Sequence, residues 1–169
     1  MAFLFPGYYY RSAYSVPYAK LYDEGMRGVI FDIDNTLVCH GAPANDRALE
    51  LMDELKKLGY RICFLSNNGE QRVKSFNEKI GAVYIYKAGK PKKEGYLKAC
   101  EAMGTKPGET FFVGDQIFTD IIGANLSGIK SFLVKRIGPK EEIQIHLKRI
   151  LEAPIVLLFR CMHKKRCRL

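Results

Sequence analysis

The sequence predicts an α/β fold, a three-layer sandwich in which helices cover both faces of a central parallel sheet of about five strands. Two observations favour this class: short apolar runs alternate with segments of helical periodicity, and polar clusters follow several of the apolar runs. The chain has 169 residues, of which 47% are hydrophobic, so it can close one substantial core. We therefore expect a single domain.

The five expected strands are short apolar runs bounded by polar or turn-forming residues. The first is continuous over residues 28–33, and the others span 61–65, 83–86, 111–113 and 131–134. Continuous apolar runs are typical of strands that are buried on both faces of a parallel sheet.

Helices are expected between these strands, where apolar residues recur at helical spacing. The first spans about 46–58, with Asn45 or Asp46 able to cap its start and Gly59 able to end it in the left-handed conformation. Further helical stretches lie around 73–80, 96–103 and 117–126. After Pro139 an amphipathic helix is expected to run to about Leu151.

The net charge of +9 is concentrated near the carboxyl end of the chain. Residues 130–169 hold eleven Lys or Arg against three Glu, which is nearly all of the excess. Such a run is typical of a solvated end, but it also attracts anionic lipid or nucleic acid. The candidates for such a contact are Arg160, Lys164, Lys165, Arg166 and Arg168.

The two ends of the chain differ in composition from its middle, and eight aromatic residues fall in the first twenty-two. We expect an aromatic N-terminal segment over 1–27 packed on or near the core, a core over 28–152 that carries the chemistry, and a basic C-terminal tail over 153–169. The longest apolar stretch, 150–159, contains Glu152 and Pro154, so no transmembrane segment is expected. Five cysteines without CxxC spacing are typical of a reducing, cytoplasmic setting.

Four polar clusters fall where the expected strands end. They are residues 32–36, residues 66–68, Lys90, and residues 115–120. Because an open α/β sheet binds its ligands outside the carboxyl ends of its strands, we expect these clusters to meet in one crevice.

Asp32 and Asp34 form an acidic pair at the end of the first strand. Residues two apart on an extended backbone point to the same side. Two like charges held that close destabilise each other unless a cation lies beside them. Hard carboxylate oxygens without a nearby histidine favour Mg²⁺, so the pair predicts a magnesium site.

The same residues suit phosphoryl transfer. An aspartate can attack phosphorus and form an aspartyl-phosphate, and a second carboxylate can protonate the leaving group and then activate water. Mg²⁺, Lys90 and the Ser66 hydroxyl can neutralise the charge of the transferring group.

In order along the chain, these residues resemble the four motifs of the haloacid dehalogenase-like superfamily, whose core is Rossmann-like. Residues 32–36, Ser66, Lys90 and residues 114–120 are similar to the first, second, third and fourth motif. More narrowly, the stretch from about 8 to 165 resembles the YqeG-type phosphatases of class IIIA. Its aromatic lead-in and the segments 66–68, 87–91 and 114–120 carry that match.

The resemblance implies a Mg²⁺-dependent phosphatase. Asp32 would be the nucleophile and a metal ligand, and Asp34 the acid/base and a ligand through its carbonyl. Asp115 would be a further metal ligand, and Asp120 would support the metal or Lys90.

The resemblance also implies a phosphate site. Ser66, Asn67 and Lys90 would bind the phosphate, and Thr36 and Gly114 would support the site. Some members of the family dephosphorylate phosphatidylglycerophosphate, so this lipid enters as a candidate substrate.

The chain leaves no room for the cap domain that many relatives place over the site. Only ten residues separate Asp34 from Asn45, and twenty-three separate Ser66 from Lys90. An uncovered crevice suits a large or membrane-borne phosphomonoester, or closure by another subunit. Tyrosines settle at the interface between lipid and water and basic residues are drawn to anionic leaflets, so the two ends of the chain predict peripheral contact with the inner face of a membrane. The alternative is that the tyrosines pack on the sheet edge.

Other functions stay open at this point. One is a phosphatase of a soluble sugar, nucleotide or phosphoprotein. Another is a non-enzymatic phospho-accepting receiver, although it has no need of a second aspartate to activate water. The basic tail alone also suggests a nucleic-acid-binding module, but the chain lacks a recognisable recognition motif.

Overall fold

The computed structural model describes residues 2–138 and 143–168. Its centre is a seven-stranded, wholly parallel sheet in the order β4-β3-β2-β5-β6-β1-β7. The strands are β1 (Tyr8–Tyr10), β2 (Gly28–Phe31), β3 (Arg61–Leu65), β4 (Val83–Ile85), β5 (Thr110–Gly114), β6 (Lys130–Val134) and β7 (Cys167–Arg168). The predicted α/β class is confirmed, while the count of about five strands was low because β1 and β7 were missed.

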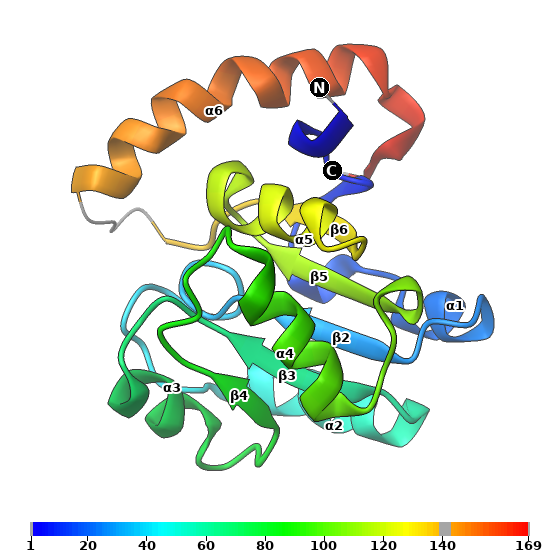
Figure 1. Ribbon diagram of the computed structural model, residues 1–169, viewed down its shortest axis with the longest axis vertical. Coiled ribbons are helices and arrows are strands. Elements are labelled where there is room, and N and C mark those ends of the chain that lie inside the picture. The colour runs from blue at the N-terminus through cyan, green and yellow to red at the C-terminus, as the bar shows by residue number, and fades with distance from the viewer. Residues whose placement is uncertain (1, 139–142, 169) are drawn as a thin grey trace.

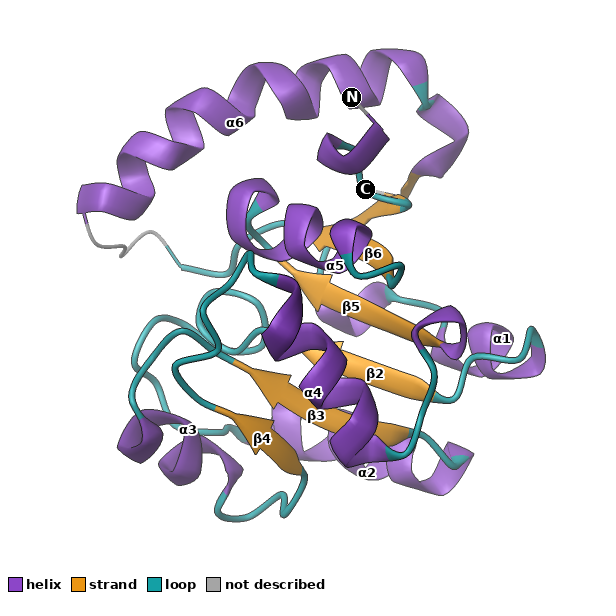
Figure 2. Cartoon of the chain, in the orientation of Figure 1, coloured by secondary structure: helices purple, strands orange, loops and turns teal. Residues whose placement is uncertain are grey.

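Helices lie on both faces of the sheet, as Figures 1 and 2 show. On one face Val29 and Phe31 of β2 pack in a cluster with α1 (Tyr18–Asp23), α2 (Asp46–Leu58) and α3 (Glu70–Asn77). On the other face Ile30 packs with α4 (Lys93–Met103) and α5 (Ile122–Leu126). The alternation of side chains along β2, together with full burial of every residue in the strand, explains its continuous apolar run.

The predicted start and end of α2 are confirmed. The Asn45 side chain accepts a hydrogen bond from the backbone N–H of Ala48, which satisfies one of the free amides of the first turn. Gly59 ends the helix with a φ of 95°, in the left-handed region that favours glycine.

The N-terminal tyrosines build part of the sheet. Tyr8–Tyr10 pair in parallel with Phe132–Val134, and the rings of Tyr8 and Tyr10 pack edge-on against Phe132. The buried Tyr18 hydroxyl donates to the carbonyl of Ala13. Of the two alternatives for these aromatics, packing against the sheet is the one that the structure shows. The division of the chain into leader, core and tail remains a proposal.

The C-terminal helix α6 (Ile143–Met162) is longer than expected. The prediction that it ends at about Leu151 was wrong: it continues through Pro154, at the cost of one backbone hydrogen bond. Contacts with the core offset that cost. Phe159 is 1% exposed and packs against Phe5, and the Glu152 carboxylate accepts from the backbone N–H of Phe118 at 2.9 Å. The expected start after Pro139 lies outside the described residues.

Two features of the structure bear on membrane contact. Cys167–Arg168 pair with β1, so the described end of the basic segment is part of the sheet. Among the helices of the described residues, none has both the length and the apolar character needed to span a bilayer.

Candidate active site

Four neighbouring strands bring the predicted polar clusters to one edge of the sheet. Asp32 follows β2, Ser66 follows β3, Asp115 follows β5, and Lys90 follows β4 after a short loop. These strands are adjacent and parallel, in the order β4-β3-β2-β5, so their carboxyl ends lie together. The structure thus places the clusters at one edge of the sheet, as the sequence predicts.

Lys90 links two carboxylates at this edge of the sheet. Its Nζ atom lies 2.6 Å from Oδ1 of Asp32 and 2.8 Å from Oδ1 of Asp120. All three residues are buried, with exposed fractions of 8%, 7% and 0%. Removing such charges from water is costly unless they are paired, so the ammonium group stabilises both aspartates where they stand.

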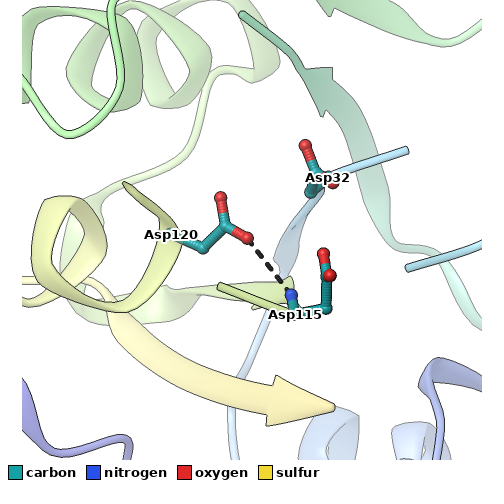
Figure 3. A group of neighbouring side chains, drawn as sticks. All are labelled: Asp32, Asp115 and Asp120. Carbon is teal, nitrogen blue, oxygen red and sulfur yellow. Dashed lines mark hydrogen bonds between the residues drawn. The ribbon is translucent and has the colours of Figure 1, made fainter. Parts of the chain in front are cut away.

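The Asp120 carboxylate binds the backbone at the start of the loop that begins with Asp115. Its Oδ2 atom accepts backbone N–H groups from Asp115 at 3.1 Å and from Gln116 at 3.0 Å, and Figure 3 shows the first of these bonds. Gly114 makes this approach possible, since a Cβ atom there would lie 2.5 Å from Oδ2 of Asp120. Both oxygens of Asp120 are therefore engaged within the protein, and its supporting role stays a prediction.

Asp32, Asp115 and Asp120 form a buried cluster that fits a divalent cation. Each offers a carboxylate oxygen, and these atoms lie within 4.8 Å of one another. The Thr36 hydroxyl donates to Oδ1 of Asp115 at 2.8 Å and fixes its orientation. Three buried carboxylates beside a single ammonium leave excess negative charge, and hard oxygen donors are the ligands that Mg²⁺ prefers.

The electrostatics of Asp32 agree with this surplus of negative charge. Burial, opposed by Lys90 and reinforced by Asp120 and Asp115, raises the pKa of Asp32 to about 8. Burial acts against the charged form of Lys90 as well, but Asp120 and Asp32 outweigh it and raise the pKa of the ammonium group. A cation beside Asp32 would favour its ionised form.

The prediction that the Asp32 and Asp34 side chains point to the same side was wrong, because β2 ends at Phe31 and the backbone does not stay in the strand; the Asp34 side chain lies apart from the cluster and faces α3. Its Oδ1 atom accepts from the Gly41 backbone N–H at 2.7 Å and from Nη2 of Arg72 at 2.9 Å, and its Oδ2 atom accepts from Asn68 Nδ2 at 2.7 Å. Arg72 also donates to the carbonyl of Ala42. Arg72 was not predicted from the sequence, because an arginine on a helix carries no local signal of the carboxylate that it reaches.

Asn67 and Ser66 shape the loop beside Lys90. The Asn67 side chain accepts the Lys90 backbone N–H at 2.8 Å and donates to the Lys90 carbonyl at 3.2 Å, so it fixes the backbone that presents the lysine. The buried Ser66 hydroxyl accepts the backbone N–H of Asn68 at 3.1 Å, which leaves its own proton available to a phosphate oxygen. The phosphate-binding roles of both residues stay predictions.

A family model described as haloacid dehalogenase-like hydrolase matches residues 39–128. The chain belongs to this hydrolase family, as its motifs and fold predict. It is 33% identical over 155 residues to the probable phosphatase YqeG of Bacillus subtilis (strain 168), a match that covers 91% of this chain and 90% of that protein. The chain is therefore a phosphatase and acts on a phosphorylated substrate, which sets aside the non-enzymatic alternatives.

A further relative is phosphatidylglycerophosphate phosphatase 1, chloroplastic/mitochondrial, of Arabidopsis thaliana, at 29% identity over 153 residues. The match covers 83% of this chain and 43% of that protein. Among solved structures, NagD from E. coli K-12 has a TM-score of 0.56 at 14% identity, over 67% of this chain and 89% of that chain. A putative beta-phosphoglucomutase from Thermotoga maritima has a TM-score of 0.53 at 13% identity, over 72% and 91%. The structural likenesses show the fold.

Proposed function

We propose that this phosphatase hydrolyses a phosphomonoester in a Mg²⁺-dependent reaction that passes through an aspartyl-phosphate on Asp32. The observation that carries the proposal is the buried network in which Lys90 bridges Asp32 and Asp120 beside Asp115. The matched family segment begins at residue 39, after Asp32, so the role of the first motif rests on this geometry.

In the first half-reaction, Oδ2 of Asp32 attacks phosphorus and the bond to the ester oxygen breaks. We assign the attack to Oδ2 because Oδ1 is in contact with Lys90. Asp34 gives a proton to the departing oxygen, which leaves as an alcohol. Asp34 then takes a proton from water as the water attacks phosphorus, and the bond from phosphorus to Asp32 breaks to release phosphate and restore the enzyme.

The side chains of Asp32 and Asp115 and the backbone carbonyl of Asp34 would hold Mg²⁺, with Asp120 in support. When bound, the cation neutralises charge on the phosphoryl group. Lys90 and the Ser66 hydroxyl donate to the phosphoryl oxygens and orient them.

We further propose a large or membrane-borne substrate such as phosphatidylglycerophosphate, reached by peripheral contact with the cytoplasmic face of a membrane. The Arabidopsis relative supports the lipid. Helix α6 supports membrane contact, because it exposes five large apolar residues beside a basic end: Ile150, Leu151, Leu157, Leu158 and Met162. The basic residues are Arg160, Lys164, Lys165, Arg166 and Arg168, each worth about 1 kcal/mol near an anionic leaflet.

The test compares phosphate release from vesicles containing phosphatidylglycerophosphate with release from soluble sugar phosphates, nucleotides and phosphopeptides, with and without Mg²⁺. We expect turnover of the lipid to exceed that of every soluble ester and to stop with EDTA. Equal or faster turnover of a soluble ester would favour the alternative, a phosphatase of soluble substrates.

A further inference from the structure

A cleft of about 510 Å³ lies between α6 and the carboxyl end of β6, beside the network that Lys90 organises. Figure 1 shows α6 as a long helix that passes over this side of the domain. The volume is in the range of pockets that hold small organic ligands. The residues of the cleft that matter below are Asp115, Lys135, Arg136, Val156, Leu157 and Arg160.

The cleft adjoins the catalytic site. Asp115 belongs to the cleft wall and also to the carboxylate cluster with Asp32. On the other side, the segment after β6 runs along the Asp32–Thr36 loop, since the backbone N–H of Ile137 donates to the carbonyl of Asn35 at 2.9 Å. A molecule whose phosphoryl group lies at Asp32 can therefore extend into the cleft.

The inner side of α6 forms one wall of this cleft because of its helical spacing. Glu152 and Phe159 are buried, and Ile155 and Val156 pack against the core, which places this stripe toward the sheet. The Glu152 carboxylate is directed to the Phe118 backbone N–H. The acidic residue in this wall is thus already engaged with the protein.

The cleft also holds three basic residues beside an apolar surface. Lys135, Arg136 and Arg160 are exposed and line it together with the acidic Asp115 and Glu152. Val156 and Leu157 supply an apolar wall, and Leu157 is 62% exposed. Guanidinium groups recognise phosphate oxygens through paired hydrogen bonds. This combination suits a ligand that carries an anionic phosphate next to a hydrocarbon chain.

We propose that the cleft binds the leaving-group part of the substrate, and that this part bears a second, non-reacting phosphate followed by an apolar chain. The inference rests on the proposed function. It extends that function by placing the reacting phosphate at Asp32 and the leaving group in the cleft, with Asp115 between them. Arg136 and Arg160 bind the second phosphate, and Leu157 contacts the start of the chain. The anionic group is either the phosphodiester of a lipid headgroup or a phosphate of a soluble bisphosphate, and the chain favours the lipid.

The test measures binding of dihexanoyl-phosphatidylglycerol, the short-chain form of the dephosphorylated product, to the full chain by calorimetry at monomeric lipid concentrations. The comparison ligands are dihexanoyl-phosphatidylcholine, which has the chains without net charge, and glycerol 3-phosphate, which has the anion without chains. The variants are Arg160→Gln, Arg136→Gln and Leu157→Asn. Lys98→Gln serves as the matched control. It removes one exposed charge from α4, a helix that contributes no residue to the cleft.

We expect each arginine variant to weaken binding of dihexanoyl-phosphatidylglycerol about tenfold, as for a lost hydrogen bond to a charged group, with Lys98→Gln equal to the parent. The zwitterionic lipid should bind at least about tenfold more weakly, since it lacks the net charge that the arginines recognise. If glycerol 3-phosphate binds as tightly as the lipid and Leu157→Asn has no effect, the anionic site stands and its occupant is a soluble phosphate.

The proposal is overturned if the parent does not bind the anionic lipid, if both arginine variants bind it as tightly as the parent, or if both lipids bind equally. Because product binding requires no turnover, the outcome is separate from the proposed hydrolysis. If the protein binds the lipid through the arginines but does not hydrolyse phosphatidylglycerophosphate, the proposed reaction is rejected and the binding role of the cleft stands. If it hydrolyses the lipid without arginine-dependent binding, the binding role of the cleft is rejected and the proposed reaction stands.

Discussion

Asp34 is held by Arg72, whose Nη2 atom lies 2.9 Å from Oδ1 of the carboxylate across 38 residues of sequence. The contact joins the loop after β2 to helix α3, so the helix sets the direction of a residue that we propose as the acid/base. Arg72 also donates to the carbonyl of Ala42. Ala42 lies in the same loop as Gly41, whose backbone N–H donates to the Asp34 carboxylate. The arginine therefore orders both the side chain and its loop.

Replacing Arg72 should impair turnover more than substrate binding. We expect Arg72→Ala to lower kcat by about ten- to a hundredfold, since misplacing a catalytic group by about 1 Å can cost this much, with a small change in KM. Arg72→Lys should recover part of kcat because one donor is kept. Steady-state kinetics with p-nitrophenyl phosphate measure both constants. Equal kcat in Arg72→Ala and the parent would remove the positioning role.

Lys90 should be needed for stability as well as activity. Lys90→Met leaves Asp32 and Asp120 buried without their partner, and breaking such a buried pair costs about 3–5 kcal/mol. We expect urea unfolding in EDTA to show a loss of this size, and Mg²⁺ to restore more stability to the variant than to the parent. A variant as stable as the parent in EDTA would show that the carboxylates do not depend on Lys90.

The pKa of Asp32 predicts a pH dependence of stability in the metal-free protein. The folded pKa is raised from 3.8 to about 8, so between these values the folded state keeps a proton that the unfolded state has lost. Stability then falls as pH rises, by up to about 1.4 kcal/mol per pH unit for a single group. Asp32→Asn should lack this part of the slope between pH 5 and 8. Parallel stability curves for parent and variant in EDTA would contradict the shift.

Gly114→Ala should disturb the site without removing a polar group. The added methyl would meet Asp120 at 2.5 Å and Phe112 at 2.6 Å, so the loop that begins at Asp115 has to shift. We expect weaker Mg²⁺ binding and a loss of activity of about a hundredfold. Gly108→Ala, with open space around it, is the control and should behave as the parent. Titration of Mg²⁺ against phosphate release measures both effects, and unchanged Mg²⁺ affinity in Gly114→Ala would count against the account.

The sequence predicted the buried strands and helices well, because the spacing of apolar residues and the turn-forming residues at element ends are local signals. The run 28–33 and the glycine after α2 indicated a strand and a helix end, and both were found, although β2 ends at Phe31. Strand β1 was missed because three consecutive tyrosines show neither alternation nor length, and their pairing with Phe132 comes from distant sequence. The end of α6 was misplaced because Pro154 normally ends a helix, and the contacts of Phe159 outweigh that preference.

The candidate site divides in the same way. Asp32, Lys90 and Asp115 were predictable because each directly follows or lies near the end of a strand, and parallel strands share an edge. Arg72 was not, since an arginine on an exposed-looking helix position gives no sign of the Asp34 carboxylate that it reaches. The cleft beside α6 depends on how that helix crosses the sheet, which no local pattern reports.

The most direct measurement is covalent labelling of the enzyme during turnover. The parent, acid-quenched with Mg²⁺ and phosphate-labelled substrate, should carry label on the peptide that contains Asp32. Asp32→Asn should carry none and release no phosphate, while its circular dichroism matches the parent. Sustained phosphate release by Asp32→Asn, or label on another residue, would contradict the assignment of Asp32 as the nucleophile.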